Sequence, residues 1–159
     1  MSNVELSPEV HRNLGIELFN QTWELMDKPD RTPAEDATML EFVHSSAYHW
    51  SFAGTAVNQQ RSYWQISRVY AVLGIPDACL LFAKLCRECT ESGLSEMEDF
   101  DIAFSFEALA RAYALNGELK KTAEMFKSAV EAGKLIKDEE DRKIFSDSLN
   151  SGILTQFGP

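Results

Sequence analysis

The chain has 159 residues, which is typical of one domain, and its 45% hydrophobic and 25% charged residues are typical of an ordered globular protein. The formal net charge of −10 argues against binding to nucleic acid or to anionic membranes, because both depend on clustered lysines and arginines. No apolar run approaches the roughly 20 residues of a membrane-spanning helix, and residues 1–8 lack the basic and apolar regions of an export signal.

The N-terminal third predicts a pair of helices over residues 8–54. Ser7 followed by proline is a typical N-cap with proline at the first helical position. Thr32 and Glu35 match a capping box, in which each side chain binds the other residue's backbone N–H, and this starts the second helix. Gly54 is expected to end it.

A second pair is predicted over residues 57–93. Its first helix, over about 57–73, is expected to end at Gly74, because glycine readily adopts the left-handed conformation of a helix C-cap. Pro76 prevents continuation of that helix, and Gly93 ends the second helix of the pair.

A third pair is predicted over residues 95–133, and a capping helix over 138–151. Ser95 and Glu98 match a capping box that opens the third pair. Acidic residues at the start of the last helix suit the positive end of the helix dipole, and the tail after Gly152 is expected to be frayed. The sequence therefore predicts a single all-α domain over 1–159 with about seven helices.

The second and third pairs form an internal repeat. A displacement of 43 residues superposes Gly74 on Gly117 and Tyr70 on Tyr113. The other aligned positions are Tyr63 with Phe106, Ile66 with Leu109, Ser67 with Ala110, Cys79 with Thr122, Ala83 with Phe126, and Cys86 with Ala129.

These positions resemble the tetratricopeptide repeat, in which large, small and aromatic residues alternate in this order along two helices. The 43-residue spacing is longer than the family's usual period and is similar to kinesin-light-chain-type repeats. The segment from Tyr48 to Gly74 also resembles an uncharacterised bacterial helical-repeat family, which implies no activity. The resemblance implies a short right-handed superhelix of antiparallel helix pairs, with the last helix capping its C-terminal end.

The resemblance also implies a concave groove lined by the first helix of each pair. The groove residues would be Arg61, Trp64, Arg68, Phe104, Glu107 and Arg111. Three arginines in an acidic protein suggest a site for an acidic peptide, a chain-terminal carboxylate or a small anion, with the two aromatic residues supplying apolar contact. The alternative is that Glu107 pairs with Arg111 one turn on, or with Arg68 across helices, on a solvated face.

A second candidate pocket contains Glu41, His44, Tyr48 and His49, all from the second helix. Glu41 and His44 have the spacing found in di-iron helical bundles, but no second copy of that motif occurs in the sequence. The interpretation that these histidines bind neighbouring helices by hydrogen bonds is favoured over a metal or small-molecule site.

Cys86 and Cys89 have the spacing of redox or zinc motifs, but neither the βαβ context nor further ligands are present. Cys79 and Cys86 occupy repeat positions that require small buried residues, so packing explains them. An odd number of cysteines within one short helix indicates a reducing compartment, and we expect a cytoplasmic protein.

The sequence thus favours a non-catalytic interaction module that binds a protein or peptide segment, without cofactor or metal. Two alternatives stay open: a small-molecule or metal-dependent activity around the second-helix pocket, and a structural subunit that associates with a second copy of itself.

Overall fold

The computed structural model describes residues 5–158, and within them it contains seven α-helices, two short 3-10 turns and no strand. The prediction of an all-α protein of helix pairs is confirmed. The helices are α1 (Pro8–Met26), α2 (Pro33–Ala53), α3 (Ala56–Val72), α4 (Pro76–Ser92), α5 (Asp99–Leu115), α6 (Leu119–Gly133) and α7 (Glu139–Leu149), and the 3-10 turns are η1 (Leu94–Glu96) and η2 (Gly152–Gln156).

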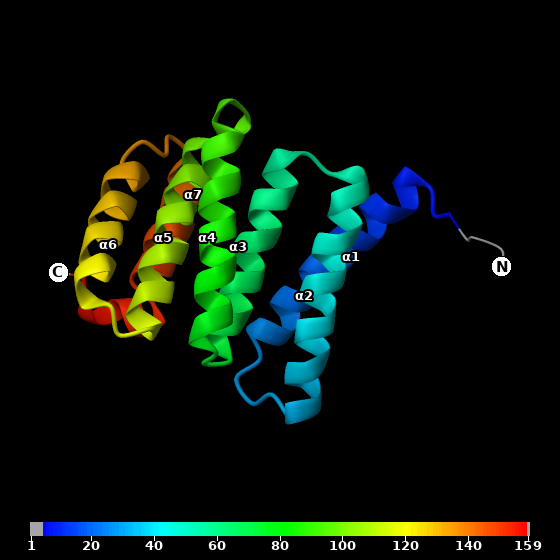
Figure 1. Ribbon diagram of the computed structural model, residues 1–159, viewed down its shortest axis with the longest axis horizontal. Helices are drawn as coiled ribbons and strands as arrows, with labels where there is room; N and C mark the ends of the chain where they lie inside the picture. Colours follow the sequence, from blue (N-terminus) through cyan, green and yellow to red (C-terminus); the bar gives the residue numbers. More distant parts are fainter. Residues whose placement is uncertain (1–4, 159) are drawn as a thin grey trace.

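The three pairs α1–α2, α3–α4 and α5–α6 stand side by side, and the two ends of the chain lie at opposite ends of the row (Figure 1). The closest packing is within each pair, and α2 contacts α3 as α4 contacts α5. Helix α7 does not extend the row beyond α6. It turns back, lies behind α5 in this view and contacts both α5 and α6.

The turns within the two repeat pairs have the same geometry. Gly74 and Gly117 both adopt positive φ, of 68° and 73°, which only glycine does at little cost. In each turn the N–H after the glycine donates to a carbonyl five residues earlier, from Ile75 to Tyr70 and from Glu118 to Tyr113. This is the Schellman arrangement, so the aligned glycines serve the same purpose in both pairs.

Most predicted helix ends are found in the structure. Ser7 caps α1, Thr32 and Glu35 form the expected capping box of α2, and Gly54 ends α2. The predicted start of the fifth helix at Ser95 is wrong. Residues 94–96 form η1, and α5 begins only after Glu98, where the carboxylate of Asp101 accepts from the Glu98 N–H.

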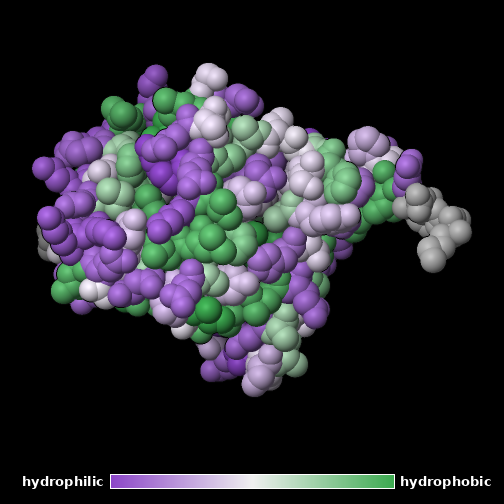
Figure 2. All heavy atoms as spheres, in the orientation of Figure 1, coloured by the Kyte–Doolittle hydropathy of each residue, from purple (hydrophilic) through white to green (hydrophobic). Residues whose placement is uncertain are grey.

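Small residues at the equivalent positions of α4 and α6 are completely buried. They are Cys79 and Cys86 in α4, and Thr122 and Ala129 in α6. Their size allows the paired helices to approach closely, as the repeat pattern predicted. Some large apolar side chains stay exposed, among them Leu81 on α4 and Leu119 on α6. Figure 2 shows apolar surface between polar side chains on the face that it presents. Within the described residues, no helix is long and apolar enough to cross a membrane.

The C-terminal segment is part of the core. Phe145 and Leu149 of α7 are buried against α5 and α6, together with Ile136 before α7 and Leu154 in η2. The expectation of a frayed tail after Gly152 is therefore wrong, because Leu154 is fully buried and ties the tail to the core.

A Gly133→Ala substitution tests this packing. A methyl group at position 133 would overlap the ring of Phe145, so we expect a loss of about 1–3 kcal/mol in the free energy of unfolding, measured by urea denaturation. The control is the same change in a Phe145→Leu background, where the ring is absent and the additional loss should nearly vanish. Equal losses in both backgrounds would contradict the packing described.

Candidate functional site

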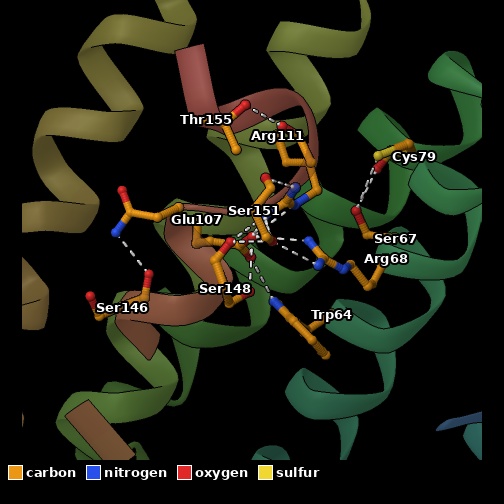
Figure 3. Close-up of polar contacts among 12 residues, drawn as sticks. Trp64, Ser67, Arg68, Cys79, Glu107, Arg111, Ser146, Ser148, Ser151 and Thr155 are labelled. Carbon is orange, nitrogen blue, oxygen red and sulfur yellow. Dashed lines mark hydrogen bonds and ion pairs between the residues drawn. The ribbon is translucent and has the colours of Figure 1, made fainter. Parts of the chain in front are cut away.

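The buried carboxylate of Glu107 is the centre of the predicted groove (Figure 3). Its side chain is 1% exposed and lies on α5. Arg111, one turn further along α5, donates from Nε and Nη2 to Glu107 Oε1 at 2.8 and 2.5 Å. From α3, Trp64 Nε1 donates to Glu107 Oε2 at 3.0 Å, and Arg68 Nη1 lies 3.5 Å from Glu107 Oε1. The structure thus brings four of the six predicted groove residues into one network.

The C-terminal end of α7 closes this network from the other side. Arg111 Nη2 donates to the carbonyl of Ser148 at 2.7 Å, and Arg111 Nη1 donates to the carbonyl of Ser151 at 3.0 Å. Arg68 Nη2 donates to the Ser151 hydroxyl at 3.2 Å. The last carbonyls of a helix have no partner within it and carry partial negative charge, so Arg111 caps α7. The capping residue of the last helix is therefore supplied by the groove itself.

Arg61, the third predicted arginine, is also paired. It donates to Asp101 of α5 from Nε at 2.7 Å and from Nη2 at 3.2 Å, and it lies 3.7 Å from Glu98. The hydrogen bond that Arg61 donates to Asp101 raises the pKa of Arg61. At Arg68, burial lowers the pKa, and the nearby Glu107 opposes this effect. Both guanidinium groups are thus engaged by the protein's own side chains.

The structure favours the alternative interpretation of the arginines. Glu107 pairs with Arg111 along α5 and with Arg68 across helices, as that alternative proposed, but the face is buried and not solvated. The acidic-ligand hypothesis depended on arginines free to bind a ligand. Within the described residues, Arg61, Arg68 and Arg111 all have protein partners.

The part of the concave face that remains open is an aromatic furrow made of two adjoining hollows. The larger has a volume of about 490 Å³ and the smaller about 150 Å³, and both are lined by Phe19 and Arg61. The furrow is lined by side chains from α1, α2, α3, α5 and α7. Its large apolar side chains are Ile16, Phe19, Trp23, Trp50, Trp64, Phe100, Phe104 and Ile144.

Aromatic rings in the larger hollow contact one another and form a continuous wall. The ring centroids of Trp23 and Trp64 are 5.7 Å apart, those of Trp64 and Phe104 are 5.1 Å apart, and those of Phe100 and Phe104 are 4.6 Å apart. The hydrogen bond between Trp64 and Glu107 fixes one ring of this wall. The buried network therefore positions part of the open surface.

Acidic residues outnumber basic ones in the lining of the larger hollow. The acidic residues are Glu98, Asp101 and Asp141, and the only cation among the described lining residues is Arg61. Glu98 and Asp101 belong to the start of α5, and Asp141 belongs to the first turn of α7. The starts of two helices thus bring carboxylates to the same edge of the furrow.

The second predicted pocket does not form a single site. Glu41 is exposed, and the side chain of Tyr48 is 60% exposed. His44 Nε2 lies 2.9 Å from the hydroxyl of Tyr70 in α3, whereas His49 Nδ1 lies 2.9 Å from Nδ1 of His11 in α1. None of the four α2 residues lines the aromatic furrow.

The cysteine and metal motifs gain no support from the geometry. Cys79 and Cys86 are completely buried, and burial raises the pKa of both thiols, which disfavours the reactive thiolate. Burial also raises the pKa of Cys89. Among residues 5–158, no group of three or more histidine, cysteine, aspartate and glutamate side chains has an arrangement able to hold a metal ion.

Comparison with known proteins adds no relative. The chain matches no protein-family model, no curated protein and no solved structure. The function is therefore inferred from the geometry of the furrow.

Sequence patterns missed the contributions of α1 and α7 to the site. Phe19 and Trp23 lie within the predicted first helix pair, and Ile144 and Ser148 lie within the predicted capping helix, but none of them was among the predicted groove residues. One signal was present in the repeat register. Trp64 and Glu107 are equivalent positions 43 residues apart, and a tryptophan opposite a carboxylate in adjacent repeats can form the hydrogen bond that is observed.

A Glu107→Gln substitution tests the buried network. It removes the negative charge shared by two arginines in a buried site, so we expect a loss of about 3–5 kcal/mol in the free energy of unfolding, measured by denaturant titration. Asp147→Asn is the control, because Asp147 forms an exposed ion pair with Lys143 and its loss should leave the denaturation midpoint unchanged. Similar midpoints for both variants would contradict a central part for Glu107.

The histidines of α2 predict a pH dependence of stability. Burial lowers the pKa of His44, and burial together with the nearby His11 lowers the pKa of His49. Near and below the ordinary histidine pKa of 6.5, these two side chains bind protons more readily in the unfolded chain than in the folded protein. The free energy of unfolding should therefore fall as the pH decreases from neutral through that value. Denaturation at a series of pH values measures this.

The control for the pH series is a His44→Gln, His49→Gln variant, which cannot titrate at these positions. Its stability should change less between neutral and mildly acidic pH than that of the unaltered protein. Identical pH profiles for the two proteins would exclude these histidines as the cause.

Proposed function

We propose that the protein is a non-catalytic interaction module of the tetratricopeptide type that binds a segment of a partner protein along the aromatic furrow. The observation that carries this proposal is the open hollow of about 490 Å³ in the concave face, continued by a second hollow through Phe19 and Arg61. Two adjoining hollows across several helices suit an extended or helical peptide segment better than one compact ligand.

The composition of the furrow supports recognition of apolar side chains. Binding energy at protein interfaces is concentrated on a few large side chains that enter well-packed pockets, and tryptophan is enriched among them. The furrow contains three tryptophans, Trp23, Trp50 and Trp64, beside phenylalanines from α1 and α5.

The furrow is favoured over the arginines at the bottom of the groove as the binding surface. Arg111 is 5% exposed and donates to Glu107 and to two carbonyls of the C-terminal segment. A ligand at that position would have to replace the buried side chains of α7. Ile144, by contrast, is 49% exposed at the edge of the open hollow.

An Ile144→Asn variant tests the proposal. Peptides that bind the unaltered protein would be selected from a random displayed library, and their affinities for the variant would be measured by calorimetry. We expect a decrease in affinity of about tenfold or more, because a neutral polar amide replaces an apolar contact in the hollow. The matched control is Leu81→Asn on α4, which changes a leucine of similar exposure, 55%, outside both hollows.

The two variants separate furrow binding from general adhesion. Selected peptides should bind Leu81→Asn as they bind the unaltered protein. Retention of full affinity by Ile144→Asn, in a protein with unchanged helicity, would overturn the proposal.

A further inference from the structure

We infer that the segment bound in the furrow is basic, and that it places an alkylammonium group, a lysine side chain, against the aromatic wall beside Glu98 and Asp141. The inference rests on the proposed function and specifies the chemistry of its ligand. It is the opposite charge preference to the one that the three arginines suggested from sequence.

The charge of the larger hollow is complementary to a basic ligand. The larger hollow is lined by three carboxylates, Glu98, Asp101 and Asp141, against the single guanidinium of Arg61. Asp101 is 1% exposed, and its charge is offset by that of its partner Arg61, whose side chain is 44% exposed. The net charge left at the hollow is therefore that of Glu98, which is 74% exposed, and of the half-buried Asp141. Two accessible carboxylates at the edge of an apolar hollow attract a cation and repel an acidic ligand.

The helix starts at this edge do not form an anion site. A free helix N-terminus attracts anions through its unpaired N–H groups. Here the start of α7 is capped by Asp138, whose carboxylate accepts from the Asp141 N–H at 2.9 Å. The start of α5 has its own acceptor, because Asp101 Oδ2 accepts from the Glu98 N–H at 3.2 Å. Both positive ends are therefore already compensated by the chain's own carboxylates.

The aromatic wall supplies the second, independent attraction. A cation over the face of tryptophan or phenylalanine is stabilised by the negative charge of the ring face, and tryptophan is the strongest of these partners. Trp23 and Trp64 lie 5.7 Å apart on adjacent helices in the same hollow. The four-carbon stem of lysine would cover these rings while its ammonium reaches the carboxylates, a combination that neither a neutral nor an acidic side chain provides.

Three synthetic ten-residue peptides test the inference. All carry the same two leucines and one phenylalanine. They differ at four other positions, which are all lysine, all glutamine or all glutamate. Their affinities would be measured by NMR titration of the tryptophan indole signals. We expect the lysine peptide to bind about tenfold more tightly than the glutamine peptide, with the glutamate peptide weakest.

Two charge variants locate the effect. Glu98→Gln, Asp141→Asn should decrease the affinity of the lysine peptide about three- to tenfold and leave that of the glutamine peptide unchanged. The matched control, Glu88→Gln, Glu124→Gln, also removes two exposed carboxylates, from α4 and α6, and should leave both affinities unchanged. A control variant that weakens lysine-peptide binding as much as the edge variant would overturn the inference, because the attraction would then come from net charge alone.

The peptide series also separates this inference from the proposed function. Equal affinities of the lysine and glutamine peptides, both lost in Ile144→Asn, would contradict the basic ligand and leave furrow binding supported. If no peptide shifts the indole signals, both the furrow proposal and the inference built on it are overturned.

Discussion

The structure of the site depends on one buried carboxylate. Glu107 accepts hydrogen bonds from Trp64 and Arg111 and lies beside Arg68, and these groups come from equivalent helices of two adjacent pairs. Arg111 in turn caps the end of α7. A charge buried in this way is tolerated only when its partners are in place, so the carboxylate couples the stacking of the pairs to the docking of the C-terminal segment. The docked C-terminal segment in turn determines which part of the concave face stays open.

The consequence is a division of the concave face into two parts. Under α7 the groove is filled, and its arginines have structural partners. Beside α7 it is open, and Trp64 belongs to both parts, because its indole N–H binds Glu107 while its ring lines the furrow. The charged groups also differ between the two parts. Under α7 they are arginines paired within the protein, and beside α7 they are carboxylates at the starts of α5 and α7.

Local sequence signals predicted the fold well because they act within a few residues. Thr32 with Glu35 and the two turn glycines determine helix ends through their own backbone bonds, and the 43-residue spacing follows from them. The start of α5 was misplaced because two capping-box patterns overlap, Ser95 with Glu98 and Glu98 with Asp101. The helix begins at the second of them. The fold-back of α7 could not be predicted locally, since Phe145 packs against Gly133 and the helix end meets Arg111 only in three dimensions. Four of the six predicted groove residues meet at Glu107, but the covering of this cluster by the end of α7 could not be predicted locally either.

The central claim is that the C-terminal segment is part of the cooperative fold, so that the open furrow and not the arginine groove is the accessible surface. Native-state hydrogen exchange of the backbone amides tests it most directly, because amides in one cooperative unit share one opening free energy. The amides of α7 should exchange with the same free energy of opening as those of α5. Much faster exchange in α7, with α5 still protected, would contradict the claim, because the segment would then leave the groove and expose Arg68 and Arg111.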